Sequence, residues 1–263
     1  LSPMAGATSS DLYLLEYPDR REVLRVFRAE RWEIPADELS KREILILDAL
    51  TGTALPAPAP IDTFMHNGVL MSWLPGDVEL PAQPDRLWLG KLAGTLAAIH
   101  SSRITVPYVY ESWNDTTADT QPNWWRDDQL WMAAQHRARQ RPAFAPRFIH
   151  RDYHPVNVLW QAGEISGVVD WINACMGPAG IDVAHCRLNL AIMYGLEAAD
   201  VFLSEYVEAA PGYEHDAFWD LDDALGALPN VEPYAPWAEF GLTGLTTEVV
   251  RERLLAFVAA AIR

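Results

Sequence analysis

A short stretch in the second half of the chain places oxygen-bearing side chains at telling intervals. Residues 157–160 and 165–170 read as two buried strands, joined by a short loop that suits a hairpin. In an antiparallel hairpin the start of the first strand lies beside the end of the second. Asn157 and Asp170 should therefore lie at one end of the sheet, just below the loop that holds Asp152.

These three side chains have the chemistry that phosphoryl transfer requires. A divalent cation on the phosphates prefers oxygen ligands, and an acceptor hydroxyl needs a carboxylate that orients it and takes its proton. We expect Asp152 to be that base, and Asn157 and Asp170 to hold Mg²⁺. ATP or GTP would be the phosphoryl donor.

Two other interpretations compete for the same stretch. A buried Asp near a turn is often only a cap or a hydrogen-bonded core group. His150, Asp152 and His154 also alternate, so on a regular strand they would share one face, as the ligands of a metal hydrolase can. Pro155 would end that strand, however, and the hairpin would then have no explanation.

The pattern His-x-Asp-x-x-x-x-Asn at 150–157, followed by a hairpin and Asp170, resembles the catalytic loop and metal-binding Asp of kinases. Trp171 stands where protein kinases have Phe-Gly, and His154-Pro155 precede Asn157. In these details the chain is similar to the aminoglycoside phosphotransferase family, which also includes macrolide, choline and homoserine kinases.

This resemblance implies an α+β fold of the two-lobe, protein-kinase-like kind. A small N-terminal lobe with an antiparallel sheet would cover residues 1–72 and bind the nucleotide. A hinge would follow at 73–76, and a larger, mostly helical lobe at 77–263 would hold the catalytic and substrate-binding residues. An Asp in this family braces the catalytic loop, and Asp182 matches it.

The N-terminal residues fit the nucleotide-binding lobe. Residues 4–28 read as strand, turn and strand, and the turn at Gly6–Ser10 would cover the phosphates, although it contains only one Gly. Arg25 stands where kinases carry a phosphate-binding Lys, and a guanidinium can grip phosphate and a carboxylate together. Residues 35–50 predict a helix whose apolar stripe includes Glu43, the expected partner of Arg25.

Each of these two charged residues also has a simpler interpretation: Arg25 as a surface charge on an edge strand, Glu43 as an exposed acid beside the stripe. Further on, Asn67-Gly68 predicts a hairpin turn. The resemblance then implies that the main chain of Ser72 and Leu74 meets the nucleotide base.

Composition narrows the partners. The 263 residues include 20 basic and 36 acidic side chains, a formal charge of −16, which disfavours nucleic acid and suits a cationic or neutral substrate. No apolar run is long enough for a membrane span, and no signal peptide is visible. Two cysteines make no disulfide framework, so we expect free thiols and a cytoplasmic location.

The acceptor is the least determined part. Residues 213–225 carry five acids, which either bind substrate ammonium groups or form a solvated face, and the aromatic residues of 101–142 either line a pocket or anchor an insertion. We interpret His185 as a hydrogen-bonded core histidine. The expected acceptor is a small-molecule hydroxyl, in an antibiotic such as an aminoglycoside or macrolide. The alternatives are a choline- or homoserine-type metabolite kinase and a non-catalytic, kinase-like ligand-binding protein.

Overall fold

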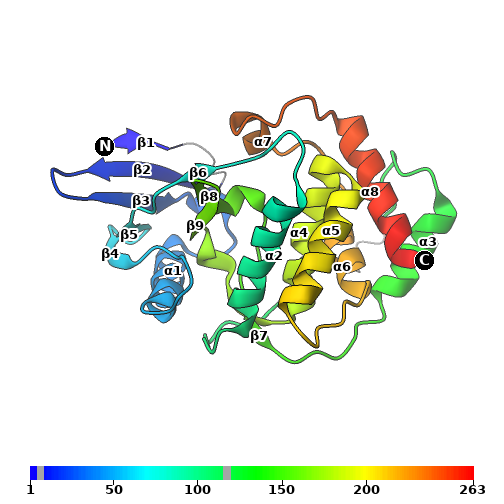
Figure 1. Ribbon diagram of the computed structural model, residues 1–263, viewed down its shortest axis with the longest axis horizontal. Coiled ribbons are helices and arrows are strands. Elements are labelled where there is room, and N and C mark those ends of the chain that lie inside the picture. Colours follow the sequence, from blue (N-terminus) through cyan, green and yellow to red (C-terminus); the bar gives the residue numbers. More distant parts are fainter. Residues whose placement is uncertain (5–8, 115–119) are drawn as a thin grey trace.

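The computed structural model describes residues 1–4, 9–114 and 120–263, and Figure 1 shows two parts of different architecture. An antiparallel sheet with one flanking helix forms the N-terminal part, and helices dominate the rest. The predicted α+β, two-lobe, protein-kinase-like fold is therefore confirmed.

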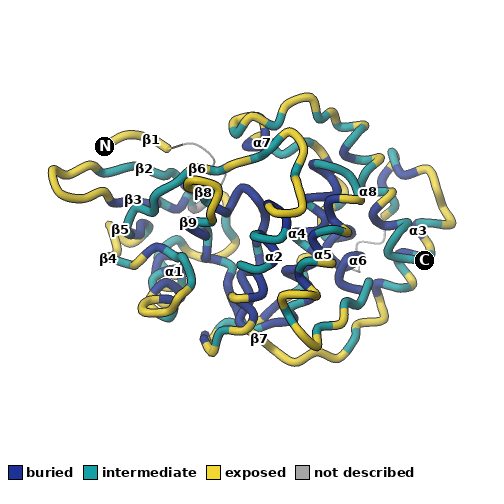
Figure 2. Tube along the Cα trace, in the orientation of Figure 1, coloured by how far each residue is buried: buried dark blue, intermediate teal, exposed yellow. Residues whose placement is uncertain are grey.

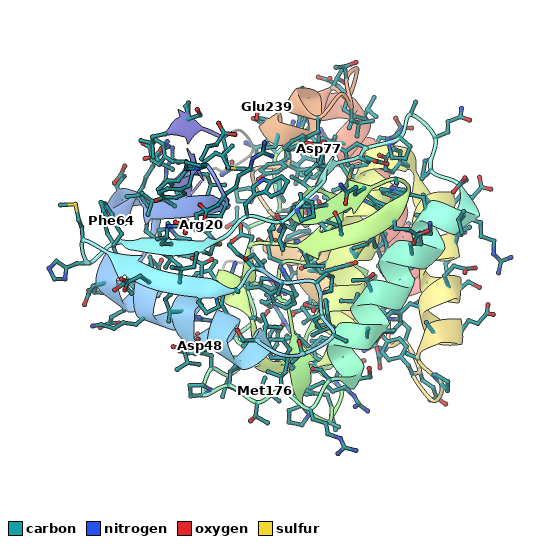
Figure 3. The ribbon with its side chains drawn as sticks, turned by 60° about the vertical axis from the view of Figure 1, so that its left-hand side comes forward. Arg20, Asp48, Phe64, Asp77, Met176 and Glu239 are labelled. Atoms are coloured by element: carbon teal, nitrogen blue, oxygen red, sulfur yellow. The ribbon has the colours of Figure 1, made fainter. Side chains whose placement is uncertain are left out.

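The N-terminal sheet has the strand order β1-β2-β3-β5-β4. Its strands span Ser2–Pro3 (β1), Ser10–Glu16 (β2), Arg21–Phe27 (β3), Pro60–Phe64 (β4) and Gly68–Ser72 (β5). Figure 3 shows Phe64, the last residue of β4, at the outer margin of this sheet. The β4–β5 hairpin was predicted, but its positive φ angles fall at Met65 (53°) and His66 (85°), one step before Asn67-Gly68.

Only part of the turn that was predicted to cover the phosphates can be placed. Gly6–Thr8 lie outside the described residues, whereas Ser9 and Ser10 lie within them. Ser10 begins β2 and is buried. The role of the turn stays a prediction.

Helix α1 (Ala36–Leu50) packs on the sheet, where it contacts β3, β4 and β5. Asp37 and Glu38 occupy its first turn, where carboxylates interact favourably with the positive end of the helix dipole. Its buried face carries Leu39, Ile46 and Leu47 at helical spacing, and Glu43 lies on the same buried face. A buried acid requires a partner, and the sheet provides one.

The chain leaves the sheet at residues 73–76. β6 (Asp77–Val78) already pairs with β8 (Val158–Gln161), so the chain joins the second part immediately after this segment. Gly76 has φ +109°, and a Cβ there would collide with the backbone of Trp160. We therefore propose the lobe boundary at 73–76, between 1–72 and 77–263.

The second part is built around α4 (Ala179–Tyr194), which is buried along nearly its whole length (Figure 2) and contacts α5, α6 and α8. The other helices are α2 (Arg86–Ser101), α3 (Asp128–Ala138), α5 (Leu196–Ala209), α6 (Phe218–Gly226), α7 (Ala235–Glu239) and α8 (Thr247–Ile262). Helix α3 is shorter than the predicted 123–141, because Asp127 caps it by accepting a hydrogen bond from the Leu130 N–H. Among the described helices, none has the length and apolar character to cross a membrane.

Candidate active site

The loop that holds Asp152 is fixed from below by Asp182. This carboxylate is fully buried and accepts hydrogen bonds from the main-chain N–H groups of His150 and Arg151, both at 2.7 Å. Burial alone would raise the pKa of Asp182, but the hydrogen bond from His100 and the charge beside it lower the pKa below the usual value. The ionised carboxylate thus holds the loop even though Arg151 has a positive φ of 72°.

The Asp152 side chain contacts two histidines. Its Oδ1 lies 3.1 Å from Nε2 of His185 and 3.7 Å from Nε2 of His154. Burial would raise the pKa of Asp152, but the hydrogen bond from His185 and the charge of His154 outweigh it and hold the pKa well below its usual range. Asp152 is therefore ionised at neutral pH, as the expected base must be.

His185 is held between two carboxylates. Its Nδ1 lies 3.1 Å from Asp223, while its Nε2 faces Asp152. Burial opposes the charged imidazolium, but Asp223 and Asp152 together raise the pKa of His185 to about 10. His185 is thus a charged residue of the candidate site, and its interpretation as an ordinary core histidine was wrong.

His154 behaves in the opposite way. Burial lowers its pKa to about 4, despite the neighbouring Asp152, so its ring is neutral at physiological pH. Its Nε2 lies 3.2 Å from the side-chain amide nitrogen of Asn157, which identifies this nitrogen as the acceptor. His154 therefore orients Asn157, a role that the spacing did not indicate.

The predicted hairpin places Asn157 beside the end of the second strand. β8 follows Asn157 directly, β9 (Glu164–Val168) pairs with it, and the Val169 N–H donates to the Asn157 carbonyl at 2.9 Å. The Asn157 amide nitrogen donates to the Asp152 carbonyl at 2.8 Å, which leaves Oδ1 as the atom for a cation. Asp170 follows at φ 64°, a left-handed conformation that turns its carboxylate away from the strand direction.

Arg25 connects the two parts of the molecule. Its Nη1 lies 2.8 Å from Glu43 Oε1 and 2.6 Å from Asp170 Oδ1, and its Nε donates to Ser10 Oγ at 3.0 Å. The predicted Arg25–Glu43 ion pair is present and buried, so neither residue is a surface charge. Burial opposes the charge of Arg25, yet Asp170 and Glu43 outweigh it and raise its pKa further.

The two residues predicted to meet the nucleotide base lie at the end of β5 and just beyond it. The Ser72 N–H donates to the Ala59 carbonyl, and its hydroxyl accepts from the Ala59 N–H, both at 2.9 Å. These bonds occupy two of the Ser72 polar groups. Leu74 lies in the proposed hinge, where its side chain approaches Gly167 of β9.

The acids of 213–225 are neither a solvated face nor a free substrate-binding row. Asp220 and Asp222 are buried on α6, and both have partners within the protein. Asp220 pairs with Arg187, and Asp222 accepts from the Tyr110 hydroxyl at 2.8 Å. Both interpretations were wrong for these residues, because packing of α6 against α4 buries them.

A cavity of about 410 Å³ opens beside Asp152. Its lining includes Trp113 from the aromatic insertion, whereas Trp125 and Trp131 of the same insertion are core residues. The insertion therefore serves both predicted roles. A ligand bound in this cavity would contact the Asp152 carboxylate directly.

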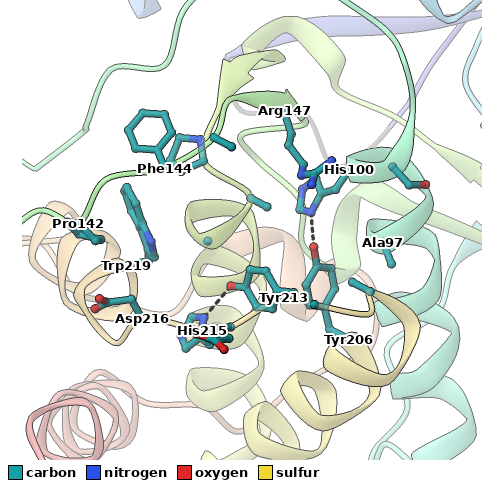
Figure 4. Close-up of a pocket in the computed structure, with 18 of the residues that line it drawn as sticks. Ala97, His100, Pro142, Phe144, Arg147, Tyr206, Tyr213, His215, Asp216 and Trp219 are labelled. Atoms are coloured by element: carbon teal, nitrogen blue, oxygen red, sulfur yellow. Dashed lines mark hydrogen bonds between the residues drawn. The ribbon is translucent and has the colours of Figure 1, made fainter.

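A larger cavity, of about 720 Å³, lies elsewhere, at the C-terminal ends of α2 and α5 (Figure 4). None of the predicted site residues lines it. Figure 4 shows His100 and Tyr206 joined across it by a hydrogen bond of 2.6 Å. The ring of His100 also contacts Asp182, so this cavity borders the support of the catalytic loop without containing the reacting groups.

Two side-chain clusters were considered as cation sites. Asp170 and the free Oδ1 of Asn157 offer the hard oxygen donors that Mg²⁺ prefers. Ligand atoms of Asp152, His154 and His185 also lie within 4.8 Å of one another, but a protonated His185 has no lone pair to offer. His150, the third member of the alternative hydrolase cluster, turns its Nε2 to the Val169 carbonyl instead.

Comparisons with known proteins agree with this geometry. The family model described as Phosphotransferase enzyme family matches residues 1–219. The homoserine kinase of Chelativorans sp. (strain BNC1) is 24% identical over 246 residues, which are 79% of this chain and 70% of that protein.

Two solved structures share the fold. Choline kinase LicA from Streptococcus pneumoniae superposes with a TM-score of 0.64 at 14% identity, over 98% of this chain and 92% of that chain. A thermostable mutant of aminoglycoside phosphotransferase APH(4)-Ia, in a ternary complex with ADP and hygromycin B, gives a TM-score of 0.63 at 16% identity, over 99% and 92% of the two chains. Because the family model covers well over half of the sequence, the chain belongs to the phosphotransferase enzyme family and is a small-molecule phosphotransferase, as its motifs predicted.

Proposed function

We propose that this protein transfers the γ-phosphoryl group of ATP or GTP to a hydroxyl of a small molecule in a Mg²⁺-dependent reaction. The observation that carries the proposal is the grouping of Asp152, Asn157 and Asp170 at one end of the β8–β9 hairpin, facing Arg25. The ADP complex of the related aminoglycoside phosphotransferase supports a nucleotide donor.

Asp152 accepts the hydrogen bond of the acceptor hydroxyl and takes its proton. His185 occupies Oδ1 of this carboxylate, which leaves Oδ2 for the acceptor. The carboxylate is ionised before the acceptor arrives, so it is ready to accept the proton. Much of the rate enhancement then comes from positioning the hydroxyl against the phosphate.

Asn157 and Asp170 hold the cation, which when bound neutralises charge on the phosphate oxygens. Arg25, braced by Glu43, directs its guanidinium at the same phosphates. The main chain of Leu74 is the preferred contact for the base, because Ser72 uses its N–H and hydroxyl on Ala59. A nucleotide donor and the buried free thiols of Cys175 and Cys186 fit a cytoplasmic location.

The acceptor class extends the proposal beyond the family. An antibiotic remains our first expectation, with choline- and homoserine-type metabolites as the alternative that the homoserine kinase relative supports. A kinase-like protein that binds a ligand without turnover is disfavoured, because Arg25 keeps the ion pair with Glu43 that a phosphate-binding Lys would make.

The test is acceptor-dependent formation of nucleoside diphosphate from Mg-ATP or Mg-GTP, measured with a panel of hydroxyl compounds. Asp152→Ala should lower turnover by about 10²–10⁴-fold and leave nucleotide binding nearly intact in a thermal-shift titration. Unchanged turnover in this variant would refute the role of Asp152.

A further inference from the structure

The cavity beside Asp152 has a distinctive balance of charge and apolar surface. This inference rests on the proposed function, because it takes the cavity as the place where the acceptor binds. The volume of about 410 Å³ is near the lower end of the usual range for ligand pockets, about 300–1,000 Å³. The described side chains that line it reveal which acceptor it suits.

Two of the three acids in the lining belong to α6, and both are already paired. Asp222 accepts hydrogen bonds from the Tyr110 hydroxyl at 2.8 Å and from Ser112 Oγ at 2.9 Å. Asp223 lies 3.1 Å from His185 Nδ1 and 3.9 Å from Arg151 Nη1. Neither carboxylate is left to pair with an ammonium group of a ligand.

The third acid is Asp152 itself, which the reaction needs for the hydroxyl and which His185 already contacts. The described lining also includes two cations, Arg151 and His185. The Arg151 guanidinium lies 3.6 Å from the centre of the Trp113 ring, which covers it. A positively charged ligand would therefore approach two fixed positive charges and find no unpaired carboxylate to offset its desolvation.

The opposite wall is apolar. It is formed by Leu188 and Ile192, one helical turn apart on α4, together with Tyr234 and Trp237. Such a wall favours a ligand that buries hydrocarbon or a ring face against it.

We infer that the acceptor is an uncharged hydroxyl compound with an apolar face, and that polycationic amino sugars are not substrates. The polar end of such a compound lies at Asp152, and its apolar face packs on Leu188 and Ile192. The strongly acidic composition, which suggested a cationic substrate, does not extend to this cavity as unpaired charge.

A matched pair of alcohols tests the inference. 3-Phenyl-1-propanol and L-phenylalaninol have the same phenyl ring and primary hydroxyl, and they differ by one ammonium group. We expect kcat/KM for phosphoryl transfer to be at least about tenfold higher for the uncharged alcohol, and kanamycin to show no transfer. Transfer to kanamycin, or a preference for L-phenylalaninol, overturns the inference while leaving the proposed function intact.

A variant with a new carboxylate at the cavity gives a second, independent readout. Ala227 is exposed at the end of α6 and lines the cavity, so Ala227→Asp adds an unpaired acid with little risk to folding. The ratio of kcat/KM should move several-fold toward L-phenylalaninol. Ala82→Asp is the matched control, since Ala82 is exposed and does not line the cavity, and its ratio should stay at the wild-type value.

Binding without turnover separates the two proposals. Intrinsic tryptophan fluorescence reports binding, because Trp113 and Trp237 line the cavity. If the uncharged alcohol binds better than L-phenylalaninol but neither is phosphorylated in the presence of Mg-ATP or Mg-GTP, the acceptor class stands and the proposed function fails. If neither alcohol binds up to its solubility limit, the inference fails.

Discussion

Nε2 of His185 lies 3.1 Å from Oδ1 of Asp152, and on its other side Nδ1 of the same ring lies 3.1 Å from Asp223. One imidazolium thus links the expected catalytic base to a buried acid of α6. The arrangement keeps Asp152 ionised and fixes which of its oxygens faces the acceptor.

The pH dependence of activity should reveal this link. His185→Gln removes the positive charge that holds the pKa of Asp152 below its usual range, so the carboxyl will take up a proton at a higher pH than in the wild type. We expect the acid limb of the kcat/KM profile to move to higher pH. His136→Gln, on the exposed face of α3, is the control and should keep the wild-type profile. An unshifted acid limb in His185→Gln would show that the contact does not tune the base.

The same residue predicts how stability depends on pH. The pKa of His185 is about 10 in the folded protein, above its usual value of about 6.5, so the folded state binds the proton more tightly than the unfolded state. This contribution is fully present below about pH 6.5 and is lost as pH rises through about 10. Thermal unfolding of wild type and His185→Gln should differ most at the acidic end of that window and converge above it. A constant difference in Tm would contradict the prediction.

The parts of the site that could be predicted are those that local spacing determines. Asn157 and Asp170 meet because a hairpin must bring the two ends together. Glu43 meets Arg25 because the apolar stripe of α1 must face the sheet. In each case a period of two or of 3.6 residues places the side chain.

The His185–Asp223 contact could not be predicted in this way. The two residues are 38 positions apart, and they meet only because α6 packs on α4. Composition made the acids of 213–225 look like a solvated or substrate-binding row, whereas burial depends on tertiary packing that no local pattern carries. The one available signal was Asp223 itself, an acid next to apolar positions of a predicted helix.

Arg25→Lys tests the departure from the usual kinase lysine. The guanidinium contacts Glu43, Asp170 and Ser10 at once, which a single ammonium on a shorter fork cannot reproduce. We expect about tenfold weaker nucleotide binding in a thermal-shift titration, with the fold retained. Arg28→Lys is matched to it, because Arg28 follows the same strand and pairs with Asp11 away from the site. Equal effects of both substitutions would argue against a specific role for Arg25.

Asp170→Ala should remove the dependence of nucleotide binding on Mg²⁺. Asp170 is the charged member of the expected cation pair, and Asn157 alone offers only a neutral oxygen. Titration of the variant with nucleotide, with and without Mg²⁺, should give two superimposable curves, whereas the wild type binds more tightly with the cation. Asp19→Ala, in the exposed β2–β3 turn, should behave as wild type. A retained Mg²⁺ effect in Asp170→Ala would place the cation elsewhere.

Asp182 supports the loop from outside the cavity, so its loss should affect stability as well as activity. Asp182→Ala leaves the buried N–H groups of His150 and Arg151 without their acceptor, at about 1–3 kcal/mol each, and removes a partner of His100. We expect a lower urea midpoint and, at temperatures where the variant is folded, a lower kcat, because Asp152 is no longer held at a fixed position. Asp182→Asn keeps one oxygen acceptor and should lose less of both. Asp48→Ala, on the exposed face of α1, controls for loss of an acid. If Asp182→Ala lowered stability but left kcat unchanged, the brace would support the fold without positioning the base.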